Sequence, residues 1–416
     1  MGDRLSLPDP NKPRNLSSRS GYAVVMDTPR LDPPIRSERL IRGRGSAENP
    51  PNRFLPLVVQ REEWVGVEDP APQTEFLEDR SRSIIARNDS SDVGFDASIN
   101  PYRGCEHGCS YCYARPTHEY LGFSAGLDFE TKVLVKPEAP SLLRAELASP
   151  RWTPQVLAMS GVTDPYQPAE RRLRLTRQCL EVLAEARNPV AVITKNHLVT
   201  RDIDLLRELS RYEAASVAVS VTTLDRSLQG RMEPRTSIPG LRLEAIARLA
   251  DAGIPVSVFV APVIPGLTDH EIPDILKAAA AAGAGRAMYI MLRLPGAVAP
   301  LFEEWLSLHF PYRAEKVMNR MRDVHDGRLY NPRFGVRQRG EGPYAEEVAR
   351  LFSLAARRYG LTRRQSSLST AAFRRPSLGP QLSLFETDPE ATDVQATDVE
   401  ATCKKATDAS QGYGLD

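Results

Sequence analysis

Hydrophobic and polar positions follow three different patterns along the 416-residue chain. Between about Phe95 and Pro295, short β-branched runs alternate with stretches in which apolar residues recur at helical spacing. Strands that alternate with amphipathic helices in this way build repeated βα units around a parallel sheet. We therefore place the core of the protein in this central region.

The apolar runs predict six strands, each nearly continuous, as strands covered on both faces of a parallel sheet require. We expect these strands at 94–100, 156–160, 190–194, 216–222, 256–263 and 287–292. Helices are expected between them at 169–186, 202–211, 241–251 and 269–282. Glycines just beyond the last two helices act as stop signals.

Six strands joined by crossover helices predict an α/β fold, a partial (β/α)6 barrel of the TIM type. Two other architectures stay open, a closed eight-stranded barrel and a doubly wound open sheet. Periodicity does not choose among them, because it specifies parallel pairing better than closure.

The regions on either side of the core lack this alternation. Eleven of the 34 prolines fall in residues 1–80, which predicts an irregular N-terminal arm. Residues 311–365 hold 13 Arg or Lys against 6 Asp or Glu, a basic extension, and a polar, repetitive tail follows. We predict four parts: an arm at 1–92, a barrel at 93–310, the basic extension at 311–365 and a disordered acidic tail at 366–416.

The charges nearly cancel over the whole chain, with 54 Lys or Arg against 53 Asp or Glu. No global field draws such a protein to nucleic acid or to an anionic membrane, so any such binding depends on local patches. The sequence has no signal-peptide core and no apolar run of bilayer length. We predict a soluble cytoplasmic protein without a membrane partner.

Three of the five cysteines lie within eight residues, at Cys105, Cys109 and Cys112, and Gly104 and Gly108 allow a tight backbone there. Such a set can wrap one compact soft-metal centre. Three ligands also leave one metal position open to substrate or cofactor, whereas a closed structural site has four.

Several interpretations of this cluster compete. His107 could complete a zinc site, although the paired cysteines of zinc ribbons are missing. A 4Fe-4S electron carrier needs a fourth ligand from afar, and Cys179 lies on an apolar helix where it is expected to pack as a small hydrophobe. The cysteines could also be three buried structural residues.

The spacing C-x3-C-x2-C, with an aromatic residue before the last cysteine and a strand before the first, resembles the radical SAM superfamily. The resemblance implies that the thiolates of Cys105, Cys109 and Cys112 hold a 4Fe-4S cluster whose remaining iron binds S-adenosylmethionine (AdoMet). It also implies one-electron cleavage of AdoMet to a 5′-deoxyadenosyl radical, which takes a hydrogen atom from the substrate. An electron donor such as flavodoxin or ferredoxin is then required.

Other motifs end the strands that follow, where a barrel places its active site. Taken alone each is weak, since a buried lysine can serve a core ion pair and Pro-Gly is an ordinary turn. The resemblance implies contacts with the methionyl amine after the second strand, with the carboxylate after the third and with adenine at Tyr111 and after the fifth. It assigns cofactor binding to Tyr111, Ser160, Thr163, Asp164, Lys195, Ser220, Ile264 and Gly266.

Within the superfamily, the run from Thr163 to Glu170, the run from Arg201 to Leu206 and the sequence after Cys112 resemble the branch of spore photoproduct lyase and DNA repair photolyase-like proteins. In that branch a tyrosine on either side of the last cluster cysteine relays hydrogen, which implies a catalytic role for Tyr111 and Tyr113.

This branch also implies a thiol hydrogen donor beside the second-strand motif, where the chain has Gly161 and Val162. We therefore expect photolyase-like chemistry on DNA or another nucleic acid that differs from the thymine-dimer lyase reaction. Whether the enzyme is a lyase or a transferase stays open. No second cysteine set indicates an auxiliary cluster.

Two features suggest partners. Arginines at 171, 172, 174 and 177 and the basic extension are expected to flank the barrel mouth, although a solvated helix face explains them equally well. In the tail, a pentapeptide resembles the motif by which bacterial DNA polymerases and repair enzymes dock on the sliding clamp, with its glutamine fixing the orientation and its last two residues filling an apolar pocket. This motif consists of Gln381, Leu382, Ser383, Leu384 and Phe385.

Two alternatives to a nucleic-acid enzyme remain from sequence. One is a radical SAM enzyme with a protein or small-molecule substrate, in which the basic residues are only structural. The other is a non-catalytic iron-sulfur adaptor tethered to the clamp.

Overall fold

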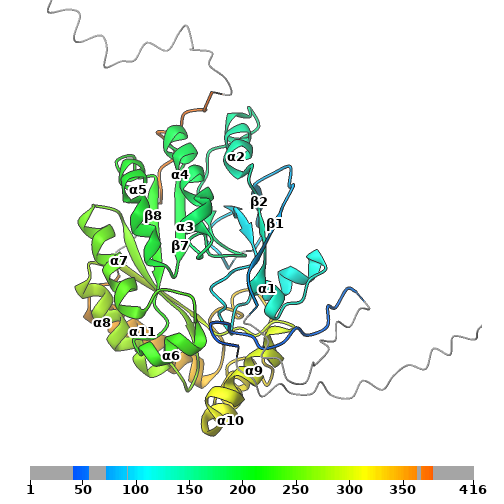
Figure 1. Cartoon of the computed structure of the whole chain (residues 1–416). Coiled ribbons are helices and arrows are strands. Elements are labelled where there is room, and N and C mark those ends of the chain that lie inside the picture. Colours follow the sequence, from blue (N-terminus) through cyan, green and yellow to red (C-terminus); the bar gives the residue numbers. More distant parts are fainter. Residues whose placement is uncertain (1–40, 56–71, 91, 363–366, 378–416) are drawn as a thin grey trace, which may run out of the picture. The chain divides into compact units, whose positions relative to one another are not determined.

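The computed structural model describes residues 41–55, 72–90, 92–362 and 367–377, which belong to a single unit of the chain (Figure 1). The tail pentapeptide at 381–385 and Cys403 lie outside the described residues. Most of the predicted N-terminal arm also lies outside them.

A seven-stranded sheet forms the centre of the molecule, in the order β10-β9-β8-β7-β6-β3-β2. Six of its strands are parallel, and β2 (Ile85–Arg87) joins the edge antiparallel to β3. The parallel strands are β3 (Ala97–Ile99), β6 (Leu157–Met159), β7 (Val190–Thr194), β8 (Ala215–Ser220), β9 (Val256–Val263) and β10 (Arg286–Met291). All six predicted strands are confirmed, with ends that differ by at most three residues.

The strand order separates the three architectures that the sequence left open. The parallel strands neighbour one another in chain order, whereas a doubly wound sheet reverses its order at a switch point. Among the described residues β10 pairs with β9 but not with β2 or β3, so the sheet is an open partial barrel of six βα units.

Helices cover the outer face of this sheet, as Figure 1 shows for α4, α5, α7 and α8. Their apolar faces and the strands form one hydrophobic core, and every residue of β8 is buried. These helices are α4 (Leu175–Ala186), α5 (Ile203–Ser210), α7 (Pro239–Asp251) and α8 (Ile272–Ala281). They correspond to the four helices predicted from periodicity.

The first predicted helix is wrong in one respect, because Arg174 breaks it. Its left-handed backbone, with φ of +56°, separates α3 (Glu170–Leu173) from α4. Arg177 then forms ion pairs with Asp202 at 2.9 Å and Asp204 at 2.7 Å. The four arginines predicted to share one helix therefore do not form a single basic surface.

Several elements were not predicted. A second sheet has the order β1-β5-β4, and three helices follow β10. The sheet consists of β1 (Glu75–Glu78), β5 (Lys132–Val135) and β4 (Tyr102–Arg103). The additional helices are α1 (Leu127–Thr131), α2 (Ala139–Ala148), α6 (Arg226–Met232), α9 (Val298–His309), α10 (Pro311–Asp323) and α11 (Pro343–Arg358), with 3-10 helices at Arg115–Leu121, His197–Asp202 and Asp269–Glu271.

The segment 367–377 lies at the amino ends of the strands. The Ser369 amide donates to the Glu213 carbonyl at 2.9 Å, just before β8. The Arg374 amide donates to the Ala186 carbonyl at 2.9 Å, just before β7. This part of the predicted disordered tail is therefore held to the barrel.

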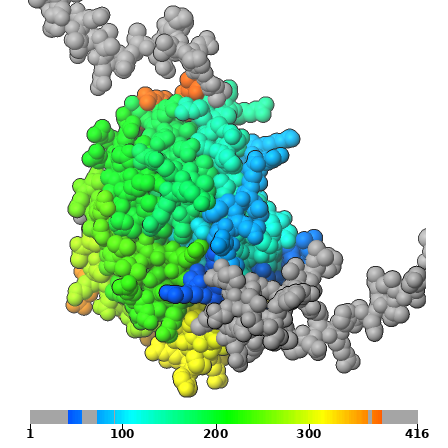
Figure 2. Space-filling view, viewed as in Figure 1, coloured from blue at the N-terminus to red at the C-terminus, as the bar shows by residue number. Residues whose placement is uncertain are grey.

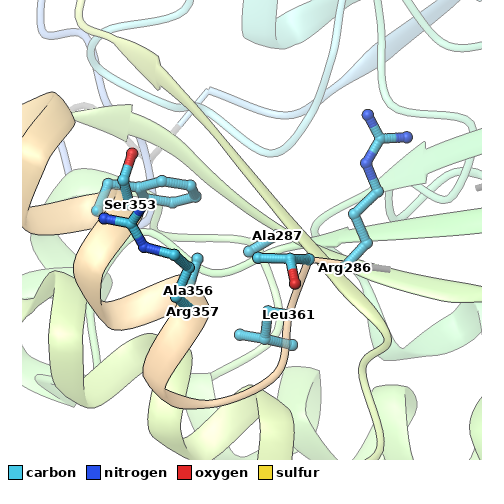
Figure 3. Close-up of a pocket in the computed structure, with 8 residues that line it drawn as sticks. Arg286, Ala287, Ser353, Ala356, Arg357 and Leu361 are labelled. Atoms are coloured by element: carbon cyan, nitrogen blue, oxygen red, sulfur yellow. The ribbon is translucent and has the colours of Figure 1, made fainter. Parts of the chain in front are cut away.

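A cavity of about 350 Å³ opens at the edge strand β10 and is shown in Figure 3. Its lining includes Arg286 and Ala287, the first two residues of β10, together with Phe352 and Arg357 of α11. Since Arg286 starts the strand, this cavity lies at the amino ends of the strands, away from the cysteine loop.

Candidate active site at the carboxyl ends of the strands

The predicted site residues follow the ends of consecutive strands. The cysteine loop comes after β3, Ser160 follows the last residue of β6, Lys195 follows β7, Ser220 ends β8 and Ile264 follows β9. The carboxyl ends of parallel strands share one edge of the sheet, so this order brings the residues to one face.

Hydrogen bonds hold the cysteine loop to the segment after β6. The Gly104 carbonyl accepts from Thr163 Oγ1 at 2.8 Å and from Gln167 Nε2 at 3.2 Å. The same glutamine accepts from the Glu106 amide at 2.9 Å. Further along the loop, the Ser110 amide donates to the Met232 carbonyl at 3.0 Å, which adds a contact to the end of α6.

Three free thiols lie on this loop. Cys105 and Cys109 are buried, and Cys112 is half-buried. Burial raises the pKa of Cys105 to about 12 and also raises the pKa values of Cys109 and Cys112. Cys112 packs both against the apolar cluster that contains Cys109 and against the one that contains Cys105, so the three thiols lie near one another. Thiolates at these positions need a cation beside them to form.

Three cysteine thiols on one loop are a donor set suited to an iron-sulfur cluster. Within the described residues, no three His, Cys, Asp or Glu side chains converge to hold one metal ion. A cube of four irons binds each thiolate at a different corner, so its ligands need not converge on one point. The set of three leaves one corner of such a cube without a protein thiolate.

His107, the zinc ligand considered from sequence, has both ring nitrogens engaged elsewhere. Its Nδ1 lies 3.4 Å from Asp164 Oδ2, and its Nε2 lies 3.2 Å from Asn196 Nδ2. Burial lowers the pKa of the imidazole, which favours its neutral form. Asn196 Oδ1 accepts from the Leu198 amide and from Ser237 Oγ, so its amino group faces the ring. We therefore assign the ring proton to Nδ1 and exclude the zinc interpretation.

Cys179 does not supply a fourth ligand. It lies in α4 with a fully buried side chain inside the main core, and burial raises its pKa. The prediction that it packs as a small hydrophobe is confirmed.

A buried ion pair holds the backbone of the cysteine loop in place. Arg115 and Glu130 are both fully buried and lie 2.5 Å apart. Arg115 donates through Nε and Nη2 to the Cys109 carbonyl at 3.1 and 2.9 Å, and through Nη1 to the Gly126 carbonyl at 2.8 Å. The position of the loop backbone therefore depends on this arginine.

The N-terminal segment 41–55 packs against the loop and the same buried pair, and Figure 2 shows it in dark blue beside the green central region. The Gly45 amide donates to Glu130 Oε2 at 3.0 Å. A Cβ on Gly45 would lie 1.7 Å from the Gly108 carbonyl oxygen, so only glycine permits this approach. This part of the predicted irregular arm is therefore ordered and covers the cysteine loop.

Tyr111 is buried and donates through its hydroxyl to Glu233. Glu233 also accepts from Thr222 Oγ1 at 3.0 Å and pairs with Arg242, which donates to the Ser220 carbonyl at 3.0 Å. Burial alone would raise the pKa of Glu233, but Arg242 and Lys195 more than offset it, and the pKa lies below its usual value. The network joins the cysteine loop to the end of β8.

Lys195 lies in the middle of the site. Its Nζ donates to Ser220 Oγ at 2.9 Å and to the Ala261 carbonyl at 3.1 Å, and it lies 5.9 Å from the centre of the Tyr111 ring. A lysine ammonium has three N–H donors, so one is left for an anionic group. The structure thus brings Lys195, Ser220 and Tyr111 together.

Three hydrogen bonds and the ring of His107 surround the carboxylate of Asp164. It accepts from Thr194 Oγ1 at 2.7 Å and from the amides of Tyr166 and Lys195, each at 2.8 Å, while His107 adds the fourth contact. The contact of Asp164 with the AdoMet amine stays a prediction. In the structure the side chain links the segment after β6 to the end of β7.

The fifth-strand turn divides into a buried and an outer part. Ile264 is fully buried in an apolar cluster that includes Cys109 and Tyr111. Gly266 has a φ of +76°, and a Cβ added to it would lie 3.8 Å from Cγ of Arg320 in α10. Ile264 is therefore placed toward the cysteine loop, whereas Gly266 shapes the contact with α10.

Tyr113 points outward, unlike Tyr111. It is 47% exposed, and its hydroxyl donates to the Gly161 carbonyl at 2.7 Å. The guanidinium of Arg293, two residues beyond β10, lies 4.3 Å from the centre of its ring. Tyr113 and Arg293 therefore lie at the mouth of the barrel.

Sequence reasoning missed the residues that hold the site from a distance. Two of them, Arg115 and Asn196, stand beside motif residues, three after Cys112 and one after Lys195, but the sequence alone gave them no role. The others occupy segments without a recognisable motif, and only the fold brings them to the cysteine loop. These others are Gly45, Glu130, Glu233, Arg242 and Arg293.

Comparison with known proteins identifies the class. Residues 99–279 match the Radical SAM superfamily. A protein of unknown function from Mycobacterium tuberculosis is 39% identical over 240 residues, which cover 57% of this chain and 69% of that protein. A radical SAM Nalpha-GlyT isomerase of Pseudomonas phage M6 is 26% identical over 265 residues, which cover 63% of this chain and 52% of that protein.

This chain belongs to the radical SAM superfamily and is an enzyme of that type. Membership implies a 4Fe-4S cluster and AdoMet as cofactors. The fold is shared with spore photoproduct lyase in complex with a dinucleoside spore photoproduct, with a TM-score of 0.50 and 16% identity over 68% of this chain and 79% of that one. No helix in the described ranges has the length and apolar character of a bilayer-spanning segment.

Proposed function

We propose that the enzyme holds its cluster on Cys105, Cys109 and Cys112 and acts on a nucleic acid. When bound, the cluster supplies the electron that cleaves AdoMet. The free N–H of Lys195 is suited to bind the AdoMet carboxylate, and Ile264 is suited to pack against the adenine. The buried ends of β7 to β9 keep water from this part of the site.

The observation that carries the choice of substrate is a set of arginines stacked on aromatic rings around the mouth. Arg293 lies over Tyr113, and Arg337 lies 4.4 Å from the centre of the Phe334 ring, which is 53% exposed. Arg337 is also ion-paired with Asp92 at 2.6 Å, and the Met291 amide at the end of β10 donates to the Gln338 carbonyl at 2.8 Å, so this segment lies beside Arg293. Unstacked bases bind to aromatic faces and guanidinium planes of this kind.

The outer face of α10 adds positive charge beside the mouth. Arg313 and Lys316 are exposed, and Tyr312 in the first turn of α10 is fully exposed. The helix packs against Gly266 at the end of β9. Phosphate groups on either side of a bound base are expected to contact this face.

The reaction is proposed to differ from that of spore photoproduct lyase. The chain has Gly161 and Val162 where that branch has a thiol donor, and Cys179 lies in the core. The Tyr113 hydroxyl donates a hydrogen bond to the Gly161 carbonyl at this position. Among the described residues at the mouth, Tyr113 is therefore the candidate that returns a hydrogen atom to the product radical.

Anaerobic fluorescence anisotropy with a labelled single-stranded oligodeoxynucleotide tests the proposed substrate class. The affinity should fall steeply with salt, and the double variant Arg313→Gln with Lys316→Gln should reduce the log–log salt slope by about 1.4, or about 0.7 for each lost phosphate contact. The control removes two exposed arginines elsewhere, at Arg207 and Arg211 near the end of α5, and should leave the slope unchanged. Affinity that does not depend on salt, in an enzyme that still forms 5′-deoxyadenosine, would favour a small-molecule or protein substrate.

We also propose that the pentapeptide from Gln381 to Phe385 docks on a bacterial sliding clamp. The motif itself lies outside the described residues, but it begins four residues after Ser377. The preceding segment is held to the amino ends of the strands through Arg374 and Arg375. A clamp held close to this segment would leave the carboxyl ends of the strands accessible to substrate.

Calorimetric titration of the full chain with a purified bacterial clamp tests this docking. Replacing both Leu384 and Phe385 by alanine should weaken binding by more than about tenfold, because these side chains are the expected anchors. Ser383→Ala serves as the matched control with little expected effect. Equal binding by native chain and anchor variant, or no binding by the native chain, contradicts the proposal.

A further inference from the structure

We infer that His107 is a positioning residue that sets the cysteine loop on the strand ends where AdoMet is expected to bind. It lies between Cys105 and Cys109 in the chain, and its side chain is 2% exposed. Three residues separate those two cysteines, and the third of them, Gly108, has no side chain. Glu106 and His107 are therefore the residues of this stretch whose side chains can connect the loop to its surroundings.

The ring connects the loop to two strand ends at once. Its Nδ1 faces Asp164, in the segment after β6, at 3.4 Å. Its Nε2 accepts from Asn196, two residues beyond β7, at 3.2 Å. A neutral imidazole donates on one side and accepts on the other, which is what this position between a carboxylate and an amide requires.

Both partners are held rigidly, so the ring transmits a defined position to the loop. Asp164 accepts from Thr194 Oγ1 and from the amide of Lys195. Asn196 caps the 3-10 helix His197–Asp202 and accepts from the Leu198 amide at 3.0 Å. The carboxylate that faces His107 is thus the one that fixes the backbone of Lys195.

The loop has little freedom to compensate for a lost ring. The His107 carbonyl accepts from the Arg235 amide at 3.3 Å, and a Cβ on the next residue, Gly108, would lie 2.6 Å from Glu130 Oε2. If the ring is removed, the loop keeps its contacts through Gly104 and Glu106 but loses its direct link to Asp164 and Asn196, the residues on either side of Lys195 in the site. AdoMet spans these two groups in the proposed site, so its binding should suffer more than cluster assembly.

The variant His107→Leu tests this inference, since leucine fills much of the space without hydrogen bonding. We expect the variant to take up iron and sulfide in native amounts after anaerobic reconstitution. Its Kd for AdoMet, measured by equilibrium dialysis, should rise by at least about tenfold, in line with the loss of hydrogen bonds in a buried network. The change that AdoMet causes in the EPR spectrum of the reduced cluster should shrink in parallel.

Two further variants separate positioning from mere stability. His107→Gln and His107→Asn each keep one hydrogen bond and should give intermediate Kd values at full cluster occupancy. His197→Leu is the matched control, because His197 is paired with Glu244 at 3.3 Å on the outside and should bind AdoMet like the native chain.

Three results would overturn the inference. The first is a Kd of His107→Leu within about twofold of native at full occupancy. The second is a loss of AdoMet binding that only follows a loss of iron, which indicates a structural role. The third result applies if His107→Leu does not take up the cluster. It is a Kd for AdoMet equal to that of the native chain in both His107→Gln and His107→Asn. If AdoMet does not change the EPR spectrum of the native chain, the result instead contradicts the assignment of the three cysteines as cluster ligands.

Discussion

Replacement of Cys109 by alanine is expected to abolish the release of 5′-deoxyadenosine from AdoMet. We expect a decrease of at least about a thousandfold, because the cluster carries chemistry that the protein groups cannot supply. Cys109 is buried beside Tyr111 and the carboxyl ends of the strands, so water cannot replace its thiolate without disturbing the loop. Iron and sulfide analysis of the anaerobically reconstituted variant, followed by chromatography of the quenched reaction, measures both effects.

Cys179→Ala is the matched control for this result. The side chain of Cys179 is also a buried thiol, but it packs in the main core within α4. The control should keep its iron and its deoxyadenosine release while losing some stability. Cluster loss in the control, or full activity in Cys109→Ala, would contradict the assigned ligands.

The second large effect concerns stability. Arg115→Leu is expected to lower the free energy of unfolding by about 3–5 kcal/mol, because it leaves the carboxylate of Glu130 buried without its partner. It also removes the donors to the Cys109 carbonyl. Anaerobic unfolding in urea, monitored by circular dichroism, measures the change.

Two controls make this expectation specific. Arg320→Gln breaks a partly exposed pair with Asp323 at 3.3 Å and should change stability by about 0.5 kcal/mol or less. The double variant of Arg115→Leu with Glu130→Leu should recover part of the loss, since no uncompensated charge remains. A loss below about 1 kcal/mol in Arg115→Leu would show that the pair does not hold the loop.

The strands of the barrel could be predicted from the sequence because their burial on both faces leaves continuous apolar runs. Val190–Thr194 and Val256–Val263 were predicted at the bounds that the structure has. The site face followed from the same strands, since residues just beyond their carboxyl ends share one edge. Lys195 and Ser220, separate in sequence, are joined by a hydrogen bond at that edge.

The supports of the site could not be predicted, because their partners are far apart in the chain. Glu130 pairs with Arg115 but also accepts from Gly45, 85 residues away, within a stretch rich in proline and arginine. Glu233 reaches Tyr111 across 122 residues. Local patterns also gave no sign of the left-handed residue Arg174, which divides a helix whose apolar spacing is regular on both sides.

The central claim is that Cys105, Cys109 and Cys112 hold a 4Fe-4S cluster with one iron open to AdoMet. EPR spectroscopy of the reduced native enzyme, recorded with AdoMet labelled with 15N at the amino group, tests it most directly. The account predicts the signal of a reduced 4Fe-4S cluster that changes on AdoMet addition and shows hyperfine coupling to the labelled nitrogen. A cluster signal that AdoMet leaves unchanged, or zinc bound in place of iron, would contradict it.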